Sequence, residues 1–241
     1  MKSILITGGS RGIGKAAAIL AGDRGWSVAV TYVRRETEAQ NTVEQIRAKG
    51  AKSFAIKGDI ASETDVIRMF RTALEEFGTL DGVVINAGIV APAAPLREMG
   101  VERLQNMFDT NILGTYLCAR EAVRCMKGGS IVNVSSLAAK TGSPGEYVDY
   151  AGAKAAMDAL TIGLAKEAGP FGIRVNAVRP AFIDTEIHSV SGNPQRAHIL
   201  GAQTPLGRAG TAAEVGEAII WLLSDASSYV TGALIDMAGG R

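Results

Sequence analysis

The segment Ser3-Ile4-Leu5-Ile6-Thr7-Gly8-Gly9-Ser10-Arg11-Gly12-Ile13-Gly14 carries the strongest structural signal in the chain. Its first five residues read as a short buried strand, and the apolar residues Ile13, Ala17 and Leu20 then recur at helical spacing. Glycines between a strand and a helix permit a tight turn and let backbone N–H groups approach a pyrophosphate at the helix N-terminus. The spacing is Gly-x-x-x-Gly-x-Gly rather than the usual Gly-x-Gly-x-x-Gly, so an ordinary glycine-rich turn remains the alternative.

The alternation of a short strand and an amphipathic helix continues along the chain. It predicts a single-domain, doubly wound α/β Rossmann fold over residues 1–241, with a seven-stranded parallel sheet and helices on both faces. One irregular, glycine- and proline-rich stretch, 182–210, interrupts the pattern and is predicted to be a substrate flap. The predicted strands are Ser3–Thr7, Ser27–Tyr32, Ser53–Lys57, Gly82–Asn86, Ser130–Ser135, Arg174–Arg179 and Ala233–Asp236. The predicted helices include one with a Val66, Phe70, Ala73 and Phe77 stripe, a long one over Val101–Met126 with a Leu104, Phe108, Leu113, Leu117 and Val123 stripe, and two over Tyr150–Ala168 and Ala212–Leu223.

Composition excludes several classes of protein. The 241 residues are 47% hydrophobic, which excludes disorder as the main state, and 25 basic against 24 acidic side chains give no reason to expect nucleic acid as a partner. No apolar run approaches the length of a membrane span, and no export signal is expected ahead of the first strand. Cys118 and Cys125 are expected to be reduced, so a cytoplasmic protein is predicted.

The end of the second strand bears on cofactor choice. An NAD-binding unit usually places Asp or Glu there to hold the ribose 2′-hydroxyl, but here Arg34 and Arg35 follow Tyr32. Guanidinium groups match phosphate oxygens in a fork, and Arg11 in the glycine loop is a third candidate. NADP(H) is therefore the preferred cofactor. In the alternative interpretation Arg34 and Arg35 belong to a solvated charge cluster and Glu36 takes the place of the NAD-binding acid, so NAD(H) stays possible.

A second motif is Tyr150-Ala151-Gly152-Ala153-Lys154, which places a phenol and an ammonium one helical turn apart. Alone this pair is common on helices. Ser136, however, follows a buried strand, at the edge where an open α/β sheet places its ligand crevice. A nearby ammonium is expected to lower the pKa of Tyr150, so that it exchanges a proton with a carbonyl or alcohol held by Ser136.

With these residues in place, the chain resembles the short-chain dehydrogenase/reductase family over essentially its whole length. The glycine loop, Asp59-Ile60, Asn86-Ala87-Gly88 and the Tyr150/Lys154 pair match that family's motifs in order and spacing. The resemblance implies that Tyr150 is the general acid/base and that Lys154 holds the nicotinamide ribose. It implies further that Ser136 positions the substrate oxygen and that Asn111 holds a water in a proton relay. The implied cofactor-binding residues are Gly8, Ser10, Arg11, Gly12, Ile13, Gly14, Arg34, Arg35, Asp59, Ile60, Asn86, Ala87, Gly88, Tyr150, Lys154, Pro180, Ile183 and Thr185.

The departures from the family pattern are small. Ile85 and Ala181 replace a frequent Asn and Gly, and Ser135 and Tyr147 are neighbours that compete with Ser136 and Tyr150 for the assignments. The stretches 143–150 and 228–232 resemble the glucose 1-dehydrogenase-like or unassigned oxidoreductase branch. A 3-oxoacyl-carrier-protein reductase is one alternative function. It is less favoured, because few basic residues stand where carrier-protein-dependent 3-oxoacyl reductases carry them. A non-catalytic dinucleotide sensor or scaffold is the other alternative.

The remaining expectations concern partners. A small-molecule carbonyl or alcohol is the expected substrate, with specificity assigned to Leu137, Tyr147, Phe182 and His188. No metal site is expected, because His188 and His198 lack a third ligand at metal spacing. Residues 101–126 and 150–168 are apolar on more than one helix face, and family members commonly pair these helices, so a homotetramer is predicted.

Overall fold

The computed structural model describes residues 2–186 and 195–241 of the chain. Its centre is a seven-stranded sheet in the order β3-β2-β1-β4-β5-β6-β9, and every neighbouring pair is parallel. The chain winds outward from β1 to β3, then returns and winds the other way from β4, as predicted. The strands are β1 (Ser3–Ile6), β2 (Ser27–Tyr32), β3 (Ser53–Lys57), β4 (Gly82–Ile85), β5 (Gly129–Val134), β6 (Ile173–Pro180) and β9 (Leu234–Met237).

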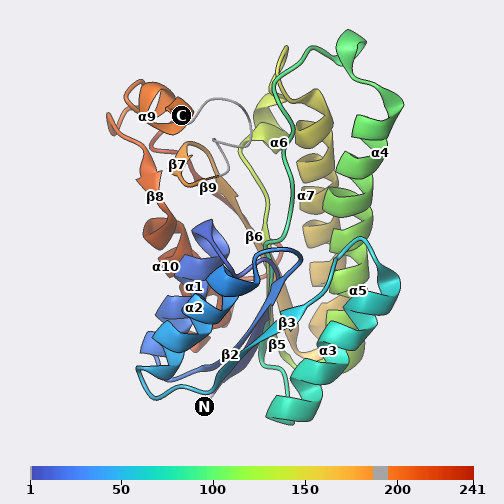
Figure 1. The fold of residues 1–241 in the computed structure, drawn as a ribbon, viewed down its shortest axis with the longest axis vertical. Helices are drawn as coiled ribbons and strands as arrows, with labels where there is room; N and C mark the ends of the chain where they lie inside the picture. The colour runs from blue at the N-terminus through green and yellow to red at the C-terminus, as the bar shows by residue number, and fades with distance from the viewer. Residues whose placement is uncertain (1, 187–194) are drawn as a thin grey trace.

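Helices cover both faces of this sheet (Figure 1). Side chains alternate along each strand, so Ile4 and Ile6 of β1 enter one apolar core while Leu5 enters the other. This double burial explains why the strands read as continuous apolar runs. One face carries α1 (Gly12–Asp23), α2 (Glu36–Arg47) and α10 (Ala212–Leu223); the other carries α3 (Glu63–Phe77), α5 (Gly114–Cys125) and α7 (Val148–Ala168).

Shorter elements lie beyond the carboxyl ends of the strands. They are α4 (Val101–Phe108), α6 (Ala138–Thr141), α9 (Arg196–Gly201) and a small parallel pair of β7 (Ile183–Asp184) with β8 (Gly210–Thr211). Single 3-10 turns span Leu96–Glu98, Gly169–Phe171 and Asp225–Ser227. The β7–β8 pair joins the two ends of the predicted flap, whose residues 187–194, including His188, lie outside the described part of the chain.

Two helices differ in detail from the sequence analysis. Helix α2 was not identified by a stripe, because its buried residues Ala39, Thr42, Val43 and Ile46 include a small and a polar residue. The long helix predicted over 101–126 is α4 and α5 joined by a π-helical turn, Asp109–Leu113. That turn shifts the phase of the helix, so Phe108 and Leu113 of the predicted stripe are 40% and 47% exposed.

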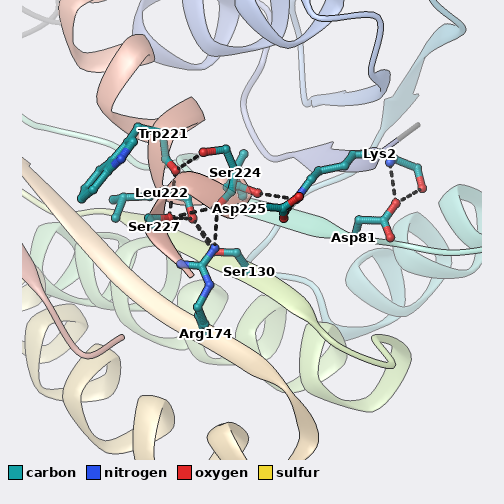
Figure 2. A network of polar contacts seen from close by, with 11 residues as sticks. Lys2, Asp81, Ser130, Arg174, Trp221, Leu222, Ser224, Asp225 and Ser227 are labelled. Atoms are coloured by element: carbon teal, nitrogen blue, oxygen red, sulfur yellow. Dashed lines mark hydrogen bonds and ion pairs between the residues drawn. The ribbon is translucent and has the colours of Figure 1, made fainter. Parts of the chain in front are cut away.

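A polar network closes the end of α10 near the amino ends of the strands (Figure 2). The Arg174 guanidinium of β6 donates hydrogen bonds to the carbonyl oxygens of Leu222 (2.8 Å), Ser224 (3.1 Å) and Val230 (3.1 Å). Lys2 donates to the Leu223 carbonyl at 3.1 Å. The last carbonyls of a helix have no partner within it and carry partial negative charge, so cations stabilise this end.

Replacing Arg174 tests how much this helix cap contributes to the stability of the protein. Arg174→Met keeps most of the side-chain stem but removes the guanidinium, and hydrogen bonds to charged groups contribute about 1.5–3 kcal/mol each. We expect the free energy of unfolding in urea to fall by about 2 kcal/mol, less than the sum, because Ser130 and Ser227 still donate to the Leu222 carbonyl. Arg71→Met is the control: its ion pair with Glu75 is long, 3.7 Å, and well exposed. Equal losses in the two variants would contradict a capping role for Arg174.

Candidate active site

A cavity of about 880 Å³ lies at the carboxyl ends of the strands, where the sheet order reverses between β1 and β4. Ligands of open α/β sheets bind at such switch points. Two predicted site residues, Gly14 and Asn111, are not among its lining residues. The other predicted residues all line it: Gly8, Ser10, Arg11, Gly12, Ile13, Arg34, Arg35, Asp59, Ile60, Asn86, Ala87, Gly88, Ser136, Tyr150, Lys154, Pro180, Ile183 and Thr185.

The glycine loop forms one end of the cavity. Gly8 and Gly12 have φ values of 67° and 54°, in a backbone region that residues other than glycine rarely adopt. Gly14 acts from behind the cavity wall, because a Cβ there would lie 2.5 Å from Asn86 Nδ2 and from the Gly8 carbonyl oxygen. The loop opens into α1 at Gly12, and neither a side-chain cap nor a first-turn acid is present at that helix end. Its backbone amides therefore fit an anionic group such as a pyrophosphate.

Thr7 and Asn86 lock this loop to the turn after β4. The buried Thr7 hydroxyl accepts hydrogen bonds from the backbone N–H groups of Asn86 and Ala87, both at 3.0 Å. In return, Asn86 Nδ2 donates to the carbonyl oxygens of Thr7 (2.9 Å) and Gly8 (3.0 Å). The Asn86-Ala87-Gly88 turn, which matches a family motif, thus supports the glycine loop. Thr7 itself was not predicted as a site residue.

At the middle of the cavity, Ser136, Tyr150 and Lys154 come together. The Ser136 hydroxyl is close enough to the Tyr150 hydroxyl to lower its pKa. Ser136 Oγ also accepts a hydrogen bond from the Ala138 N–H at 3.1 Å and donates to the Pro180 carbonyl oxygen at 3.5 Å. Lys154 Nζ donates to the Val134 carbonyl oxygen at 2.7 Å and lies 5.6 Å from the centre of the Tyr150 ring. These three side chains come from the end of β5 and from two successive turns of α7, so one strand and one helix position the whole group.

The competing residues Ser135 and Tyr147 also line the cavity, but each side chain is engaged in another contact. The Ser135 hydroxyl is buried and donates to the Lys154 carbonyl oxygen at 3.2 Å, so it joins β5 to α7. The Tyr147 ring is buried with the Arg196 guanidinium 5.3 Å from its centre. These contacts favour Ser136 and Tyr150 over Ser135 and Tyr147 as the groups that meet a substrate.

The pKa values of this group depart from the sequence expectation. Burial raises the pKa of Tyr150 to about 12, against a smaller lowering by the Ser136 hydroxyl. The expected lowering by Lys154 is therefore wrong for the protein alone, because its ammonium binds the Val134 carbonyl and lies over the ring. Burial also lowers the pKa of Lys154 to about 8, while Asp158 acts in the opposite direction. Near pH 7 the phenol is protonated and the lysine is mostly charged.

Asn111 lies behind this group, in the π-helical turn. Its side-chain oxygen accepts a hydrogen bond from the Ile89 N–H and its Nδ2 donates to the Ile89 carbonyl oxygen, both at 3.0 Å. A Cβ on Gly88 would come within 2.6 Å of Asn111 Oδ1. Both ends of the side-chain amide are thus used to hold the turn that carries Gly88, next to Lys154.

The third part of the cavity is charged. Arg35 and Arg11 both reach the Glu186 carboxylate, at 3.2 Å and 3.4 Å, while Arg34 forms no ion pair within residues 2–186 and 195–241. Glu36, the alternative mimic of an NAD acid, is not a lining residue; it lies near Tyr32, whose pKa is raised by burial and then by the Glu36 carboxylate. Glu186 was missed because sequence gives no sign that residues 35 and 186 meet.

A second ion pair lies among the residues that line the cavity. Arg196 of α9 binds Glu146 through two hydrogen bonds, 2.7 Å and 2.5 Å, and both residues line the cavity together with Phe182, Leu137 and Arg241. The Arg241 guanidinium lies 4.8 Å from the centre of the Phe182 ring. Glu146, Arg196 and Arg241 were not predicted, since no motif surrounds them in the sequence.

Known proteins resemble this chain over its whole length. A family model described as enoyl-(acyl carrier protein) reductase matches residues 8–241. The uncharacterized oxidoreductase YgfF of Escherichia coli (strain K12) is 46% identical over 100% of both chains. The 3-oxoacyl-[acyl-carrier-protein] reductase FabG of Staphylococcus aureus (strain Mu50 / ATCC 700699) is 36% identical, over 99% of this chain and 97% of that protein. A short-chain dehydrogenase/reductase of Serratia marcescens, solved as a double mutant, superposes with a TM-score of 0.93 and 32% identity, over 99% and 97% of the two chains.

The chain belongs to the short-chain dehydrogenase/reductase family. The resemblance seen in its sequence motifs is therefore confirmed, as is the Rossmann fold. Short-chain dehydrogenases/reductases are oxidoreductases that use nicotinamide dinucleotides and act on small molecules. The similarity to an uncharacterized oxidoreductase agrees with the branch that the sequence suggested.

Two other kinds of feature bear on function. In the ranges that the structure describes, no helix is long and apolar enough to cross a membrane. The same ranges hold no cluster of three His, Cys, Asp or Glu side chains that suits a metal ion. His198 instead lies 3.5 Å from the Asp184 carboxylate, on the surface.

The Thr7 hydroxyl offers a test of how the cofactor loop is held. Thr7→Val has nearly the same shape but leaves the buried N–H groups of Asn86 and Ala87 without their acceptor, at about 1–3 kcal/mol for each orphaned group. We expect NADPH or NADH affinity, measured by fluorescence titration, to fall about tenfold or more, since 1.4 kcal/mol corresponds to roughly one decade. Thr7→Ser keeps the hydroxyl and should stay near wild type. Wild-type affinity in Thr7→Val would show that the loop does not depend on these bonds.

Proposed function

We propose that this short-chain dehydrogenase/reductase transfers a hydride between NADP(H) and a carbonyl or alcohol substrate, with Tyr150 as general acid/base. The observation that carries the proposal is the grouping of Ser136, Tyr150 and Lys154 in one cavity at the switch point of the sheet, with Ser136 close enough to influence the Tyr150 hydroxyl. A phenol and a hydroxyl that lie beside each other can both contact one substrate oxygen. That arrangement suits proton transfer at a carbonyl or alcohol.

The chain's own residues fit a dinucleotide along the cavity. The glycine loop and α1 suit the pyrophosphate, Asp59 and Ile60 the adenine, and Pro180, Ile183 and Thr185 the nicotinamide carboxamide. The glycine loop is packed tightly against the turn after β4, since added Cβ atoms at Gly8 and Gly14 would meet neighbouring atoms at 2.5–3.2 Å. When bound, the nicotinamide supplies or accepts the hydride.

The proton is handled by the protein. At pH 7 Tyr150 is protonated, because burial raises its pKa to about 12, and it can donate to the oxygen of a carbonyl as hydride arrives. Ser136 holds that oxygen, and the Lys154 ammonium stabilises the phenolate that forms. We assign Asn111 to the support of the 86–89 turn and to the relay that returns a proton to Lys154.

Arg34, Arg35 and Arg11 are proposed to bind the 2′-phosphate of NADP(H). Arg34 and Arg35 line the cavity just past β2, where an NAD enzyme presents a carboxylate, and Glu36 is directed to Tyr32 instead. The residues directly after β2 therefore attract a phosphate rather than repel it. NAD(H) remains usable, with lower affinity.

A 3-oxoacyl-[acyl-carrier-protein] reductase activity is the second candidate. The 36% identity to the Staphylococcus aureus FabG protein favours it. Against it, the turns before β5 and β6 carry Gly128-Gly129 and Phe171-Gly172, and Lys127 is the basic residue left near them. Substrate panels separate the two: ketones, quinones and sugars on one side, acyl-carrier thioesters on the other. Cofactor binding without turnover of any panel member would favour a sensor or scaffold.

We also propose a cytoplasmic homotetramer. Helices α4 and α5 follow each other end to end beside α7 on one flank of the molecule (Figure 1), and five large apolar side chains of this segment and α7 are between 40% and 66% exposed. A second copy would cover such a patch. Light scattering at micromolar concentration checks this, and a monomeric mass would contradict it. The exposed side chains are Val101, Phe108, Leu113, Tyr116 and Ile162.

Tyr150→Phe tests the acid/base assignment. It removes the proton but keeps the ring, so kcat should fall about 100- to 10,000-fold while NADPH affinity stays near wild type. Tyr229→Phe is the control: Tyr229 is fully exposed and is not among the residues that line the cavity, so this variant should keep wild-type activity. If Tyr150→Phe retained most of the wild-type kcat, Tyr150 would not be the acid/base.

The double variant Arg34→Ala/Arg35→Ala tests cofactor choice. Charge-assisted hydrogen bonds contribute roughly 1.5–3 kcal/mol, so one bond to a 2′-phosphate corresponds to a preference for NADPH of about 10- to 150-fold. We expect titrations of both cofactors to show this preference in wild type and to lose most of it in the double variant. Arg71→Met, which removes a remote exposed arginine, should leave it unchanged. Equal affinities in wild type would make the arginines a solvated surface pair.

A further inference from the structure

A row of alternating charges runs behind the catalytic lysine. Asp158 Oδ2 binds Arg179 at 2.9 Å, Arg179 reaches Asp236 at 3.3 Å, and Asp236 binds Lys140 at 3.0 Å. The four residues come from α7, β6, β9 and α6, so the row joins the helix that carries Tyr150 to three neighbouring elements. None of these residues lines the cavity.

Asp158 stands nearest to Lys154 in this row. It lies four residues later on α7, on the same helix face, and helical side chains lean toward the N-terminus of their helix, here toward Lys154. The residue is only 6% exposed, and its Oδ1 has no hydrogen-bond partner within the described residues. A buried carboxylate with one oxygen unpartnered is costly unless a second positive charge compensates it.

The charges around Asp158 identify that second cation. Arg179 approaches from β6 but is shared with Asp236 of β9, which Lys140 of α6 also binds. Strand β5 presents the neutral side chains Asn133 and Ser135 toward α7. On α7 itself the cations are Lys154, four residues before Asp158, and Lys166, eight residues after it; Lys154 is the nearer along the helix, and Asp158 raises its pKa against the effect of burial.

We propose that Asp158 is a positioning residue of this site: its carboxylate, held by Arg179, is the counter-ion that keeps the Lys154 side chain charged. Its importance for catalysis rests on the proposed function, whereas the charge coupling itself does not. Arg179 then opposes the effect of Asp158 on Lys154, because Arg179 and Lys154 compete for the same carboxylate. It also directly precedes Pro180, at the start of the segment assigned to the nicotinamide.

The two partners should shift Lys154 in opposite directions, which a purely structural role would not do. Asp158→Asn keeps the shape and an acceptor for Arg179 but removes the negative charge, so the Lys154 titration midpoint should fall. An opposite charge within about 4–6 Å shifts a pKa by roughly one to three units. Arg179→Met removes the competing cation, so the midpoint should rise. Arg179→Lys keeps the charge and should stay near wild type.

The midpoint can be read without turnover. Protein labelled with 13C,15N-lysine gives Cε–Nζ shifts that follow ionisation, and the Lys154 resonance is identified by its loss in Lys154→Arg. Wild type should titrate near pH 8. An unchanged midpoint in Asp158→Asn, or shifts of the same sign in both variants, would overturn the proposal. If Asp158→Asn does not fold, Arg179→Met decides alone, and a midpoint that fails to rise overturns it.

Kinetics supply the second readout. The high-pH limb of kcat for carbonyl reduction, where Lys154 loses its proton, should move to lower pH in Asp158→Asn and to higher pH in Arg179→Met. Wild-type protein that turns over no substrate would defeat the proposed function and leave the NMR result standing. An active wild type with unmoved NMR midpoints would defeat the role of Asp158 alone.

Discussion

The common direction of the seven strands is the constraint on which the site depends. Parallel strands must be joined by crossovers, so every strand delivers its carboxyl end to the same edge of the sheet. The glycine loop, the 86–89 turn, Ser136 and the 180–186 segment all follow directly from strand ends. Distant parts of the sequence meet there without any long excursion of the chain. Helix α7 then needs only to pack on β5 and β6 to bring Tyr150 and Lys154 to that edge.

Burial sets the chemistry of that edge. The same exclusion of water that raises the pKa of Tyr150 lowers that of Lys154, because each group loses the hydration that favours its charged form. At pH 7 the phenol is therefore neutral and the ammonium mostly charged. The site is best prepared to give a proton away, and the reverse step needs help from additional positive charge near the phenol.

Much of this could be predicted from the sequence because the relevant signals are local. Strands buried on both faces are apolar throughout, and the glycine loop and the Tyr150/Lys154 spacing each lie within one short segment. The rest depends on contacts between distant segments. No sequence signal near Arg35 predicts its ion pair with Glu186, and none near Lys154 predicts that Arg179 binds Asp158 on the same helix. The π-helical turn was not predicted, because a local change of helix phase has no signature in the composition. The raised pKa of Tyr150 was not predicted either, because it follows from the packing around the side chain.

The Glu186 carboxylate has a consequence for the proposed binding of a 2′-phosphate. It is shared by Arg11 and Arg35, from two different loops, and so already acts as an internal anion. A 2′-phosphate bound by these arginines would compete with it, and the preference for NADPH would then equal the difference between the two anions rather than the full strength of the new bonds. An unphosphorylated ribose would leave the internal pair intact. Selectivity of this kind is an exchange reaction, in which the protein's own side chain sets the reference state.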